Sequence, residues 1–235
     1  MVRGPLDFAC AAHHIPRPMS SSFSPYPSPL TYAILPVKPL GQAKSRLAPS
    51  LRARTRAALV RAIFSRTLDM VAQVERIDGA IVVSRDLTIL ELARSRNVIS
   101  LVESDAGLNP AITQGAQWAQ AHGAGSIIII PVDLPLITAA DIDALIDLAI
   151  EPQCLVIAPD RHDEGTNVML VRPPDALHFA YGSSSFNVHC TQATERGLPV
   201  HIYRSPSSGL DLDVPDDLAL YQKGAALLDG HILSE

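Results

Sequence analysis

The stretch YAILPVKPLGQAKSR, from Tyr32 to Arg46, joins a short apolar run to a loop that carries three positive charges. The apolar run, Tyr32–Val37, is typical of a buried strand. The loop would then lie at the carboxyl end of that strand, where open α/β sheets bind ligands. Its basic side chains, Lys38, Lys44 and Arg46, could neutralise phosphate oxygens there. We therefore predict an oligophosphate site, although a solvated basic turn before a helix would explain the charges equally well.

The loop contains a single glycine, Gly41, and fits neither G-x-x-x-x-G-K-[ST] nor G-x-G-x-x-G. Loops of those two kinds need several glycines, because their backbone N–H groups fold around the anion. In this chain the side chains would have to hold the phosphates.

Strand-like and helix-like segments alternate from Thr31 onward with short connections, which indicates an α/β fold with a mostly parallel central sheet flanked by helices. Strands are expected at residues 32–37, 79–84, 98–103, 126–131, 154–158, 167–171 and 199–203. Helices are expected at residues 51–74, 87–94, 109–122, 139–150 and 186–196, with a closing helix after Pro215.

Residues 1–30 differ from the rest of the chain, since prolines and serines crowd the stretch from Ser20 to Pro29. Such a composition cannot bury a core, so we expect this segment to be disordered. The chain has 235 residues, of which 47% are hydrophobic and 18% charged, as is ordinary for a globular protein. We expect residues 31–235 to form one domain.

Charge and hydropathy exclude several classes of function. The formal net charge of -5 argues against a nucleic-acid-binding protein, which usually carries a basic face. The longest apolar run, Ile127–Val132, is too short to cross a bilayer, so no membrane association is expected. The three cysteines have no metal-ligand spacing and their odd number argues against a disulfide framework, so we expect a cytoplasmic protein.

Three aspartates are candidate magnesium ligands. Asp133 directly follows the most hydrophobic predicted strand and would project from the carboxyl edge of the sheet. Asp211 and Asp213 alternate with apolar residues, so that both carboxylates face the same side of an extended chain. Magnesium prefers carboxylate oxygens together with substrate phosphates. The alternative is that the acidic run ending in Asp216 and Asp217 only caps the following helix.

Further polar turns follow other predicted strands. Asn109 is the expected N-cap of a helix with Pro110 at its first position, and it could instead present its amide to a base or ribose. Gly107, beside it, would let the backbone approach a nucleotide closely. Residues 161–167 and 181–187 could bind an anionic second substrate, although serine runs before helices are more often ordinary caps.

Other chemistries have little support in the sequence. His189 and Cys190 lie on a predicted helix without spaced partners, so they do not resemble a metal site. No G-x-S-x-G elbow or Cys/His nucleophile arrangement is visible, which argues against covalent acyl transfer.

The motifs, taken together and in this order, resemble the CofC/FbiD-like guanylyltransferase family, and the resemblance runs from about Thr31 to Tyr221. They are Leu35–Lys38 with Lys44–Leu47, Gly107–Asn109, Pro131–Pro135, Gly165–Asn167, Gly182–Phe186 and Asp211–Asp213. The resemblance implies a Rossmann-like three-layer nucleotidyltransferase fold. It also implies an enzyme that couples GTP to a small phosphorylated acid with release of pyrophosphate, in the biosynthesis of a deazaflavin redox coenzyme.

Members of this family use 2-phospho-L-lactate, phosphoenolpyruvate or 3-phospho-D-glycerate, and the acid used by this chain stays open. By resemblance, magnesium would be held by Asp133, Asp211 and Asp213, and GTP by the basic loop. The phospho-acid would be bound by Thr166 or Asn167 together with Gly182 and Ser185. Many bacterial members have a glycine-proline-glycine-serine turn where this chain has Gly182–Ser185, so the acid pocket departs from the family pattern there.

Three alternatives remain. A nucleotidyltransferase of the molybdenum-cofactor or sugar-phosphate type would use the same acids and basic loop. A retaining glycosyltransferase would normally carry its D-x-D motif after a mid-chain strand, whereas Asp211 and Asp213 come late. A non-catalytic nucleotide-binding regulator would have no use for three convergent carboxylates. Under each of these alternatives, the apolar helices are compatible with a homodimer.

Overall fold

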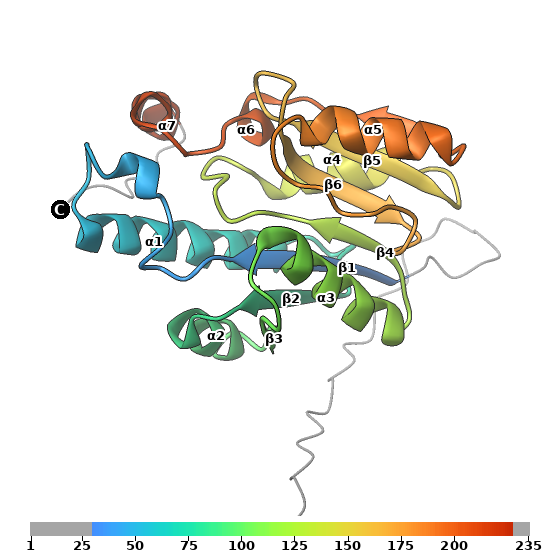
Figure 1. The fold of residues 1–235 in the computed structure, drawn as a ribbon, viewed down its shortest axis with the longest axis horizontal. Coiled ribbons are helices and arrows are strands. Elements are labelled where there is room, and N and C mark those ends of the chain that lie inside the picture. Colours follow the sequence, from blue (N-terminus) through green and yellow to red (C-terminus); the bar gives the residue numbers. More distant parts are fainter. Residues whose placement is uncertain (1–29, 228–235) are drawn as a thin grey trace, which may run out of the picture.

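The computed structural model describes residues 30–227 (Figure 1), with side-chain positions as far as Gln222. The expected disorder of residues 1–30 therefore lies outside the described residues except at Leu30, which is the first residue of a strand. The described part contains one sheet, and helices cover both of its faces.

Seven strands form the sheet in the order β3-β2-β1-β4-β6-β5-β7. In chain order they are β1 (Leu30–Val37), β2 (Gly79–Ser84), β3 (Ile99–Val102), β4 (Ala124–Ile129), β5 (Cys154–Pro159), β6 (Thr166–Arg172) and β7 (Val200–Ile202). Among these strands only β6 runs antiparallel to its neighbours, and the other pairs are parallel. The mostly parallel α/β sheet expected from the sequence is thus confirmed.

Two hydrophobic clusters build the layers on either side of the sheet. Helices α1 (Ala53–Val71), α2 (Leu87–Arg94) and α4 (Ala139–Leu148) pack on one face, and α3 (Leu108–Ala121) and α5 (Ser185–Glu195) pack on the other. Strand β1 supplies both clusters, because successive side chains of a strand point to opposite faces. Ala33, Leu35 and Val37 join the first cluster, while Ile34 joins the second.

A third, smaller cluster fixes the late segment of the chain against α1. Leu210 and Leu212 pack with Leu59 and Ile63 of α1 and with Tyr221 of α7 (Pro215–Leu227). Tyr221 is only 2% exposed. Figure 1 shows α7 beyond the sheet, above the beginning of α1. This cluster determines where the segment between α6 (Pro206–Gly209) and α7 lies.

Two short elements were not expected from the sequence, namely α6 and the 3-10 helix η1 (Ser45–Leu47). Both are too short to show a hydrophobic period. Most other ends fall within two residues of the expected ones. In the part of the chain that the structure describes, none of the helices is long and apolar enough to span a membrane.

Candidate active site at the carboxyl edge of the sheet

The Lys44 side chain lies between two of the three predicted aspartates. Its Nζ atom donates to Asp213 Oδ1 at 2.8 Å and lies 3.4 Å from Asp133 Oδ2. The guanidinium of Arg46 lies 3.9 Å from the second oxygen of Asp213. The basic loop and the acids therefore meet at one place, although Lys44 and Asp213 are separated by 169 positions in the sequence.

The charges in this cluster support one another. Burial lowers the pKa of Lys44, but Asp133 and Asp213 outweigh it, and the pKa of the ammonium is raised overall. Burial likewise works against the Asp213 carboxylate, yet Lys44, Arg46 and Lys38 hold its pKa below the usual value. Lys44 and Asp213 are therefore both ionised at neutral pH.

Asp211 has the opposite environment. Burial, together with the negative charges of Asp133, Asp213 and Asp217, raises the pKa of Asp211 to about 6. A buried carboxylate among like charges is costly to ionise, and a nearby cation would relieve that cost. A strongly shifted carboxyl in a cleft is also typical of a functional site.

The hydrophobic cluster described above orients these acids. Because Leu210 and Leu212 face α1 and α7, the side chains of Asp211 and Asp213 point to the other side of the segment. The backbone N–H of Leu212 donates to the carbonyl oxygen of Asp133 at 2.9 Å, which places the segment alongside the end of the loop after β4. The alternation predicted from the sequence thus has a direct structural basis.

Helix capping at α7 is performed by Asp217, and not by Asp213. One oxygen of Asp217 accepts from the backbone N–H groups of Asp213 and Val214 at 2.8 and 2.7 Å. Its other oxygen pairs with Arg161 at 2.7 Å. Asp217 therefore has the capping role that the sequence suggested for it, and the Asp213 carboxylate is left for Lys44.

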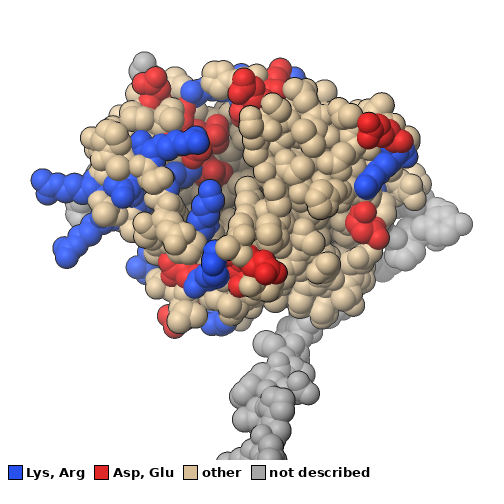
Figure 2. All heavy atoms as spheres, viewed as in Figure 1, with Lys and Arg blue, Asp and Glu red and all other residues tan. Residues whose placement is uncertain are grey.

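The three aspartates offer the hard oxygen ligands that magnesium prefers. Within residues 30–222, however, no three carboxylate, imidazole or thiolate groups are already disposed as a metal site. The Lys44 ammonium supplies the positive charge between Asp133 and Asp213 in this arrangement. Figure 2 shows a hollow on this face of the molecule, with acidic atoms inside it and basic atoms around its rim.

The residues expected to bind the phospho-acid also come together. The backbone N–H of Thr166, the first residue of β6, donates to Ser185 Oγ at 2.9 Å. The side-chain amide of Asn167 instead donates to the carbonyl oxygen of Ser208 at 2.8 Å, which ties β6 to α6. Gly182 has φ of 148°, a conformation that strongly favours glycine.

Within residues 30–227, the backbone N–H groups of Ser183 and Ser184 donate to no protein acceptor. Ser184 precedes α5 in a left-handed conformation, and its hydroxyl makes no capping hydrogen bond. The serine run is thus not an ordinary side-chain cap. It leaves unpaired donors at the amino end of an 11-residue helix, where anions bind favourably.

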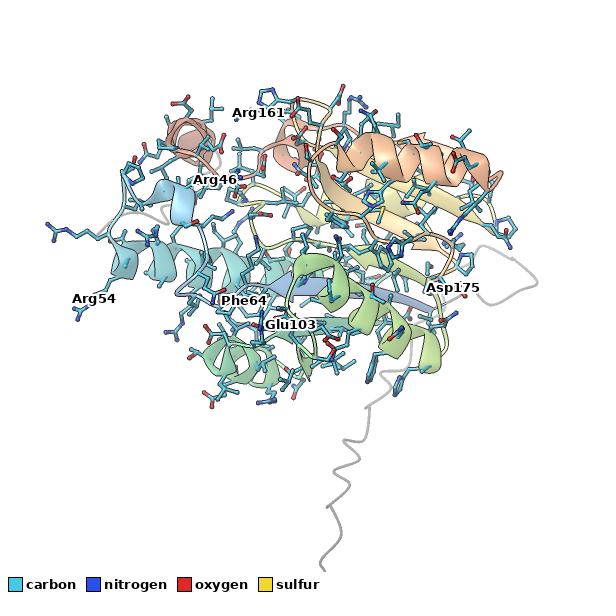
Figure 3. All side chains as sticks on the ribbon, viewed as in Figure 1. Arg46, Arg54, Phe64, Glu103, Arg161 and Asp175 are labelled. Atoms are coloured by element: carbon cyan, nitrogen blue, oxygen red, sulfur yellow. The ribbon has the colours of Figure 1, made fainter. Side chains whose placement is uncertain are left out.

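Asn109 does not cap α3, contrary to the expectation from the sequence. Gly107 is the N-cap residue, with φ of 132°, and its N–H donates to Glu103 Oε1 at 2.8 Å; Glu103 is labelled in Figure 3. Asn109 donates to the carbonyl oxygen of Tyr181 at 3.1 Å and accepts from the N–H of Tyr181 at 2.7 Å. Its amide therefore joins the first turn of α3 to the loop before α5.

The basic loop and the loop before α5 lie at the same edge of the sheet (Figure 1). The negative charge of Asp133 acts on the buried Tyr181 hydroxyl, whose pKa is raised by burial and by that charge. Arg161, labelled with Arg46 in Figure 3, follows β5, and its N–H donates to the carbonyl oxygen of Gly209, just before the aspartate segment. The geometry suits a phosphorylated nucleotide at the basic loop and a second small anion at the loop before α5.

His189 is not predicted as a site residue from the sequence. The structure places it beside the acid region, which is the group formed by Thr166, Gly182 and Ser185. It contacts Thr166 and the backbone of Ala180 through hydrogen bonds. The sequence does contain one indication of this position. Ser185 and His189 are four residues apart on a predicted helix, so they share a helix face.

Comparison with known proteins finds relatives that cover most of this chain. A family model described as "Guanylyl transferase CofC like" matches residues 31–224. A protein of Sphaerobacter thermophilus named phosphoenolpyruvate guanylyltransferase is 41% identical over 188 residues, covering 80% of this chain and 90% of the relative. A protein of Methanothermobacter thermautotrophicus named 2-phospho-L-lactate guanylyltransferase is 36% identical over 189 residues, covering 80% of this chain and 82% of the relative.

The fold also has relatives of known structure. A nucleotidyl transferase from Methanothermobacter thermautotrophicus superposes with a TM-score of 0.62 at 14% identity, covering 85% of this chain and 99% of that one. At this level of identity the likeness establishes the fold alone. The expected Rossmann-like three-layer nucleotidyltransferase fold is therefore confirmed.

Proposed function

The chain belongs to the CofC-like guanylyltransferase family, and from that premise we propose that it transfers GMP from GTP to a small phosphorylated acid. The observation that supports the proposal is the meeting of Lys44 with Asp133 and Asp213, in which the basic loop and the acidic residues come together. A protein that only bound a nucleotide would keep the basic loop but would have no use for three convergent carboxylates.

The reaction needs alignment and charge neutralisation, and no protein nucleophile. A phosphate oxygen of the acid attacks the α-phosphorus of GTP and forms a new P–O bond. The bond between the α-phosphorus and the bridging oxygen breaks, and pyrophosphate leaves with the bonding electrons. The exposed Lys38 and Arg46 bind the triphosphate in this proposal, and Gly107 and Asn109 lie on its nucleoside side.

Lys44 has a different task from the one that its position in the loop suggested. Its side chain is only 7% exposed and already pairs with two carboxylates, so it holds Asp133 and Asp213 in place and balances their charge. Asp133, Asp211 and Asp213 would hold magnesium, in competition with this ammonium. When bound, magnesium would neutralise phosphate charge in the transition state.

The second anion binds, in our proposal, at the loop before α5. Thr166 and Ser185 are buried, but within the described residues their hydroxyl protons have no protein acceptor. The N–H groups of Ser183 and Ser184 are likewise unpaired in that part of the chain, and Gly182 gives the turn its shape. Phosphoenolpyruvate is our first candidate, because the relative from Sphaerobacter thermophilus carries that name at 41% identity. The product would enter deazaflavin coenzyme biosynthesis in the cytoplasm.

The test incubates the purified protein with magnesium, each of the four nucleoside triphosphates and each of the three phospho-acids, and records pyrophosphate release. We expect release with GTP and phosphoenolpyruvate, and none after magnesium is chelated. Release with CTP or ATP and a sugar phosphate in place of GTP would support a different nucleotidyltransferase. Absence of release with GTP and all three acids would overturn the proposed function.

Asp133→Asn tests whether Asp133 is a magnesium ligand. We expect this variant to remain folded and to lose nearly all turnover, because the strand-end carboxylate is removed and the size of the side chain is kept. Turnover within a few-fold of the parent would contradict the role of Asp133 as a magnesium ligand.

A further inference from the structure

His189 lies in the interior of the acid region, with 0% of its surface exposed. Its two ring nitrogens reach different segments. The backbone N–H of Ala180 donates to Nε2 at 3.0 Å, and Nδ1 lies 3.0 Å from the hydroxyl oxygen of Thr166. The ring of Tyr181 packs edge-on against the imidazole, with the ring centroids 5.2 Å apart.

These contacts determine the protonation of the imidazole. A backbone N–H can only donate, so Nε2 must accept from Ala180 and carries no proton. A neutral imidazole then carries its proton on Nδ1. Burial, with a smaller effect of His178, lowers the pKa of His189 to about 4, in agreement with a neutral ring at neutral pH. The Nδ1–H group must therefore donate to the oxygen of Thr166.

The hydrogen bond from His189 fixes the direction of the hydroxyl of Thr166. Because the oxygen of Thr166 accepts from Nδ1, its own proton is not used by His189 and must point elsewhere. Ser185 is in the same situation, since its oxygen accepts the N–H of Thr166. Within residues 30–222 no other protein acceptor is found for either hydroxyl proton. Each hydroxyl group thus has its proton free to donate to a ligand.

We propose that His189 is a positioning residue that makes Thr166 a hydrogen-bond donor to the anionic oxygens of the phospho-acid. This inference rests on the proposed function and names a residue that acts on the substrate through Thr166. Carboxylate and ionised phosphate oxygens only accept hydrogen bonds, and a bond donated to a charged oxygen is stronger than one donated to a neutral group, so two free hydroxyl protons favour an anion in this position. If the O–H bond of Thr166 pointed away from the ligand, the lone pairs of its oxygen would face the anion instead.

The alternative is a purely structural role, in which His189 only links β6 to the loop before α5. Two substitutions separate the roles. In His189→Gln the side-chain oxygen replaces Nε2 and can accept from Ala180, but no donor remains opposite Thr166. In His189→Asn the side-chain amide nitrogen replaces Nδ1 and can still donate to Thr166, whereas the link to Ala180 is lost.

Steady-state kinetics with GTP and phosphoenolpyruvate provide the first readout. We expect His189→Gln to raise KM for the acid by about 10- to 100-fold, the range for one charge-assisted hydrogen bond, and to leave KM for GTP unchanged. We expect His189→Asn to recover most of this loss. Equal losses in both variants, or no loss in His189→Gln, would overturn the proposal. His201→Gln is the matched control, because His201 pairs with Glu151 outside the site.

A double-mutant cycle tests whether His189 acts through Thr166. Thr166→Val removes the hydroxyl and keeps the side-chain shape, and it should raise KM for the acid as much as His189→Gln does. The double variant should then show no further increase, whereas additive effects would contradict the coupling. If His189→Gln does not fold, the tautomer of His189 in the wild-type protein decides.

Nitrogen NMR of the ring gives a readout that needs no activity. In the wild-type protein at neutral pH, we expect the resonances of His189 to show the Nδ1–H tautomer. The Nε2–H tautomer, or a charged ring, would overturn the proposal even in an active enzyme. A wild-type protein that turns over no acid would overturn the proposed function, while the tautomer is still measured independently.

Discussion

Replacing Asp211 with asparagine should stabilise the ligand-free protein while it reduces turnover. Asp211 has its pKa raised to about 6, from an ordinary 3.8, by burial and by the charges of Asp133, Asp213 and Asp217. The folded protein therefore holds a proton that the unfolded chain releases between these two pH values. Stability is lost as the pH rises through this window, and above it the full cost of the charge is present.

The size of the change in the free energy of unfolding follows from the shift in the pKa of Asp211. A difference of roughly two pH units corresponds to about 3 kcal/mol at about 1.4 kcal/mol per unit. Asp211 is only partly buried, so solvent screening reduces this upper limit to roughly 1–2 kcal/mol. Asp211→Asn removes the charge and keeps the shape, and it should recover this amount above pH 7 and almost none below pH 4.

Urea unfolding of both proteins at pH 4 and pH 8, without divalent ions, measures the difference. With a denaturant dependence of about 2–3 kcal/mol per molar for a chain of this size, we expect a midpoint shift of roughly 0.5 M at pH 8. Magnesium should stabilise the wild-type protein more than Asp211→Asn. The variant should also lose most of its guanylyltransferase activity, because the ionised carboxylate of Asp211 would be a metal ligand in the wild-type protein.

Asp213→Asn is the matched control with the opposite sign. The pKa of Asp213 is lowered because Lys44, Arg46 and Lys38 outweigh the effect of its burial, so its charge contributes stability above the unfolded pKa of about 4. Asp213→Asn should therefore destabilise the protein at pH 8. The reasoning fails if Asp211→Asn brings no stabilisation at pH 8, or if it stabilises equally at both pH values.

Three further substitutions test the site and its supports. Lys44→Met should reduce turnover at least hundredfold and lower the free energy of unfolding by roughly 1–3 kcal/mol, because its two carboxylate partners lose their cation; urea unfolding and pyrophosphate release measure the two effects. Gly182→Ala should cost about 1–2 kcal/mol of backbone strain and raise KM for the acid more than KM for GTP, and unchanged kinetics would contradict the role of this turn. Asp217→Ala should lower stability by about 1–2 kcal/mol through the loss of its hydrogen bonds to Asp213 and Val214, measured by thermal unfolding, and Asp216→Ala, at an exposed position, should change it far less.

Local patterns predicted the elements well wherever turn residues mark both ends. The strand Gly79–Ser84 and the helix Leu87–Arg94 have the expected bounds, because glycine begins the strand and Asp86 caps the helix through Thr88 N–H at 3.0 Å. The start of α3 is the exception. Pro110 marks the first turn of a helix without fixing its first residue, so the sequence favours Asn109 as the N-cap, whereas the structure has Gly107 there.

The sequence indicates which residues form the candidate site better than it indicates which of them contact one another. Topology places Lys44 and Asp133 at one sheet edge, and the alternation of Asp211 and Asp213 with leucines predicts a shared side. Sequence alone does not show that Lys44 pairs with aspartates, since that depends on how a distant segment packs against α1. The contacts of His189 were missed for the same reason, because a buried histidine has no periodic signal of its own.

The reversed direction of β6 determines which end of the strand faces the substrates. β1 and β4 bring their carboxyl ends to the site, and the antiparallel β6 brings its amino end, with Thr166, to the same edge. Were β6 parallel to β4, its seven residues would carry Thr166 roughly 20 Å away, to the opposite edge. The antiparallel direction of β6 thus places both proposed substrate regions, the basic loop and the loop before α5, at one edge of the sheet.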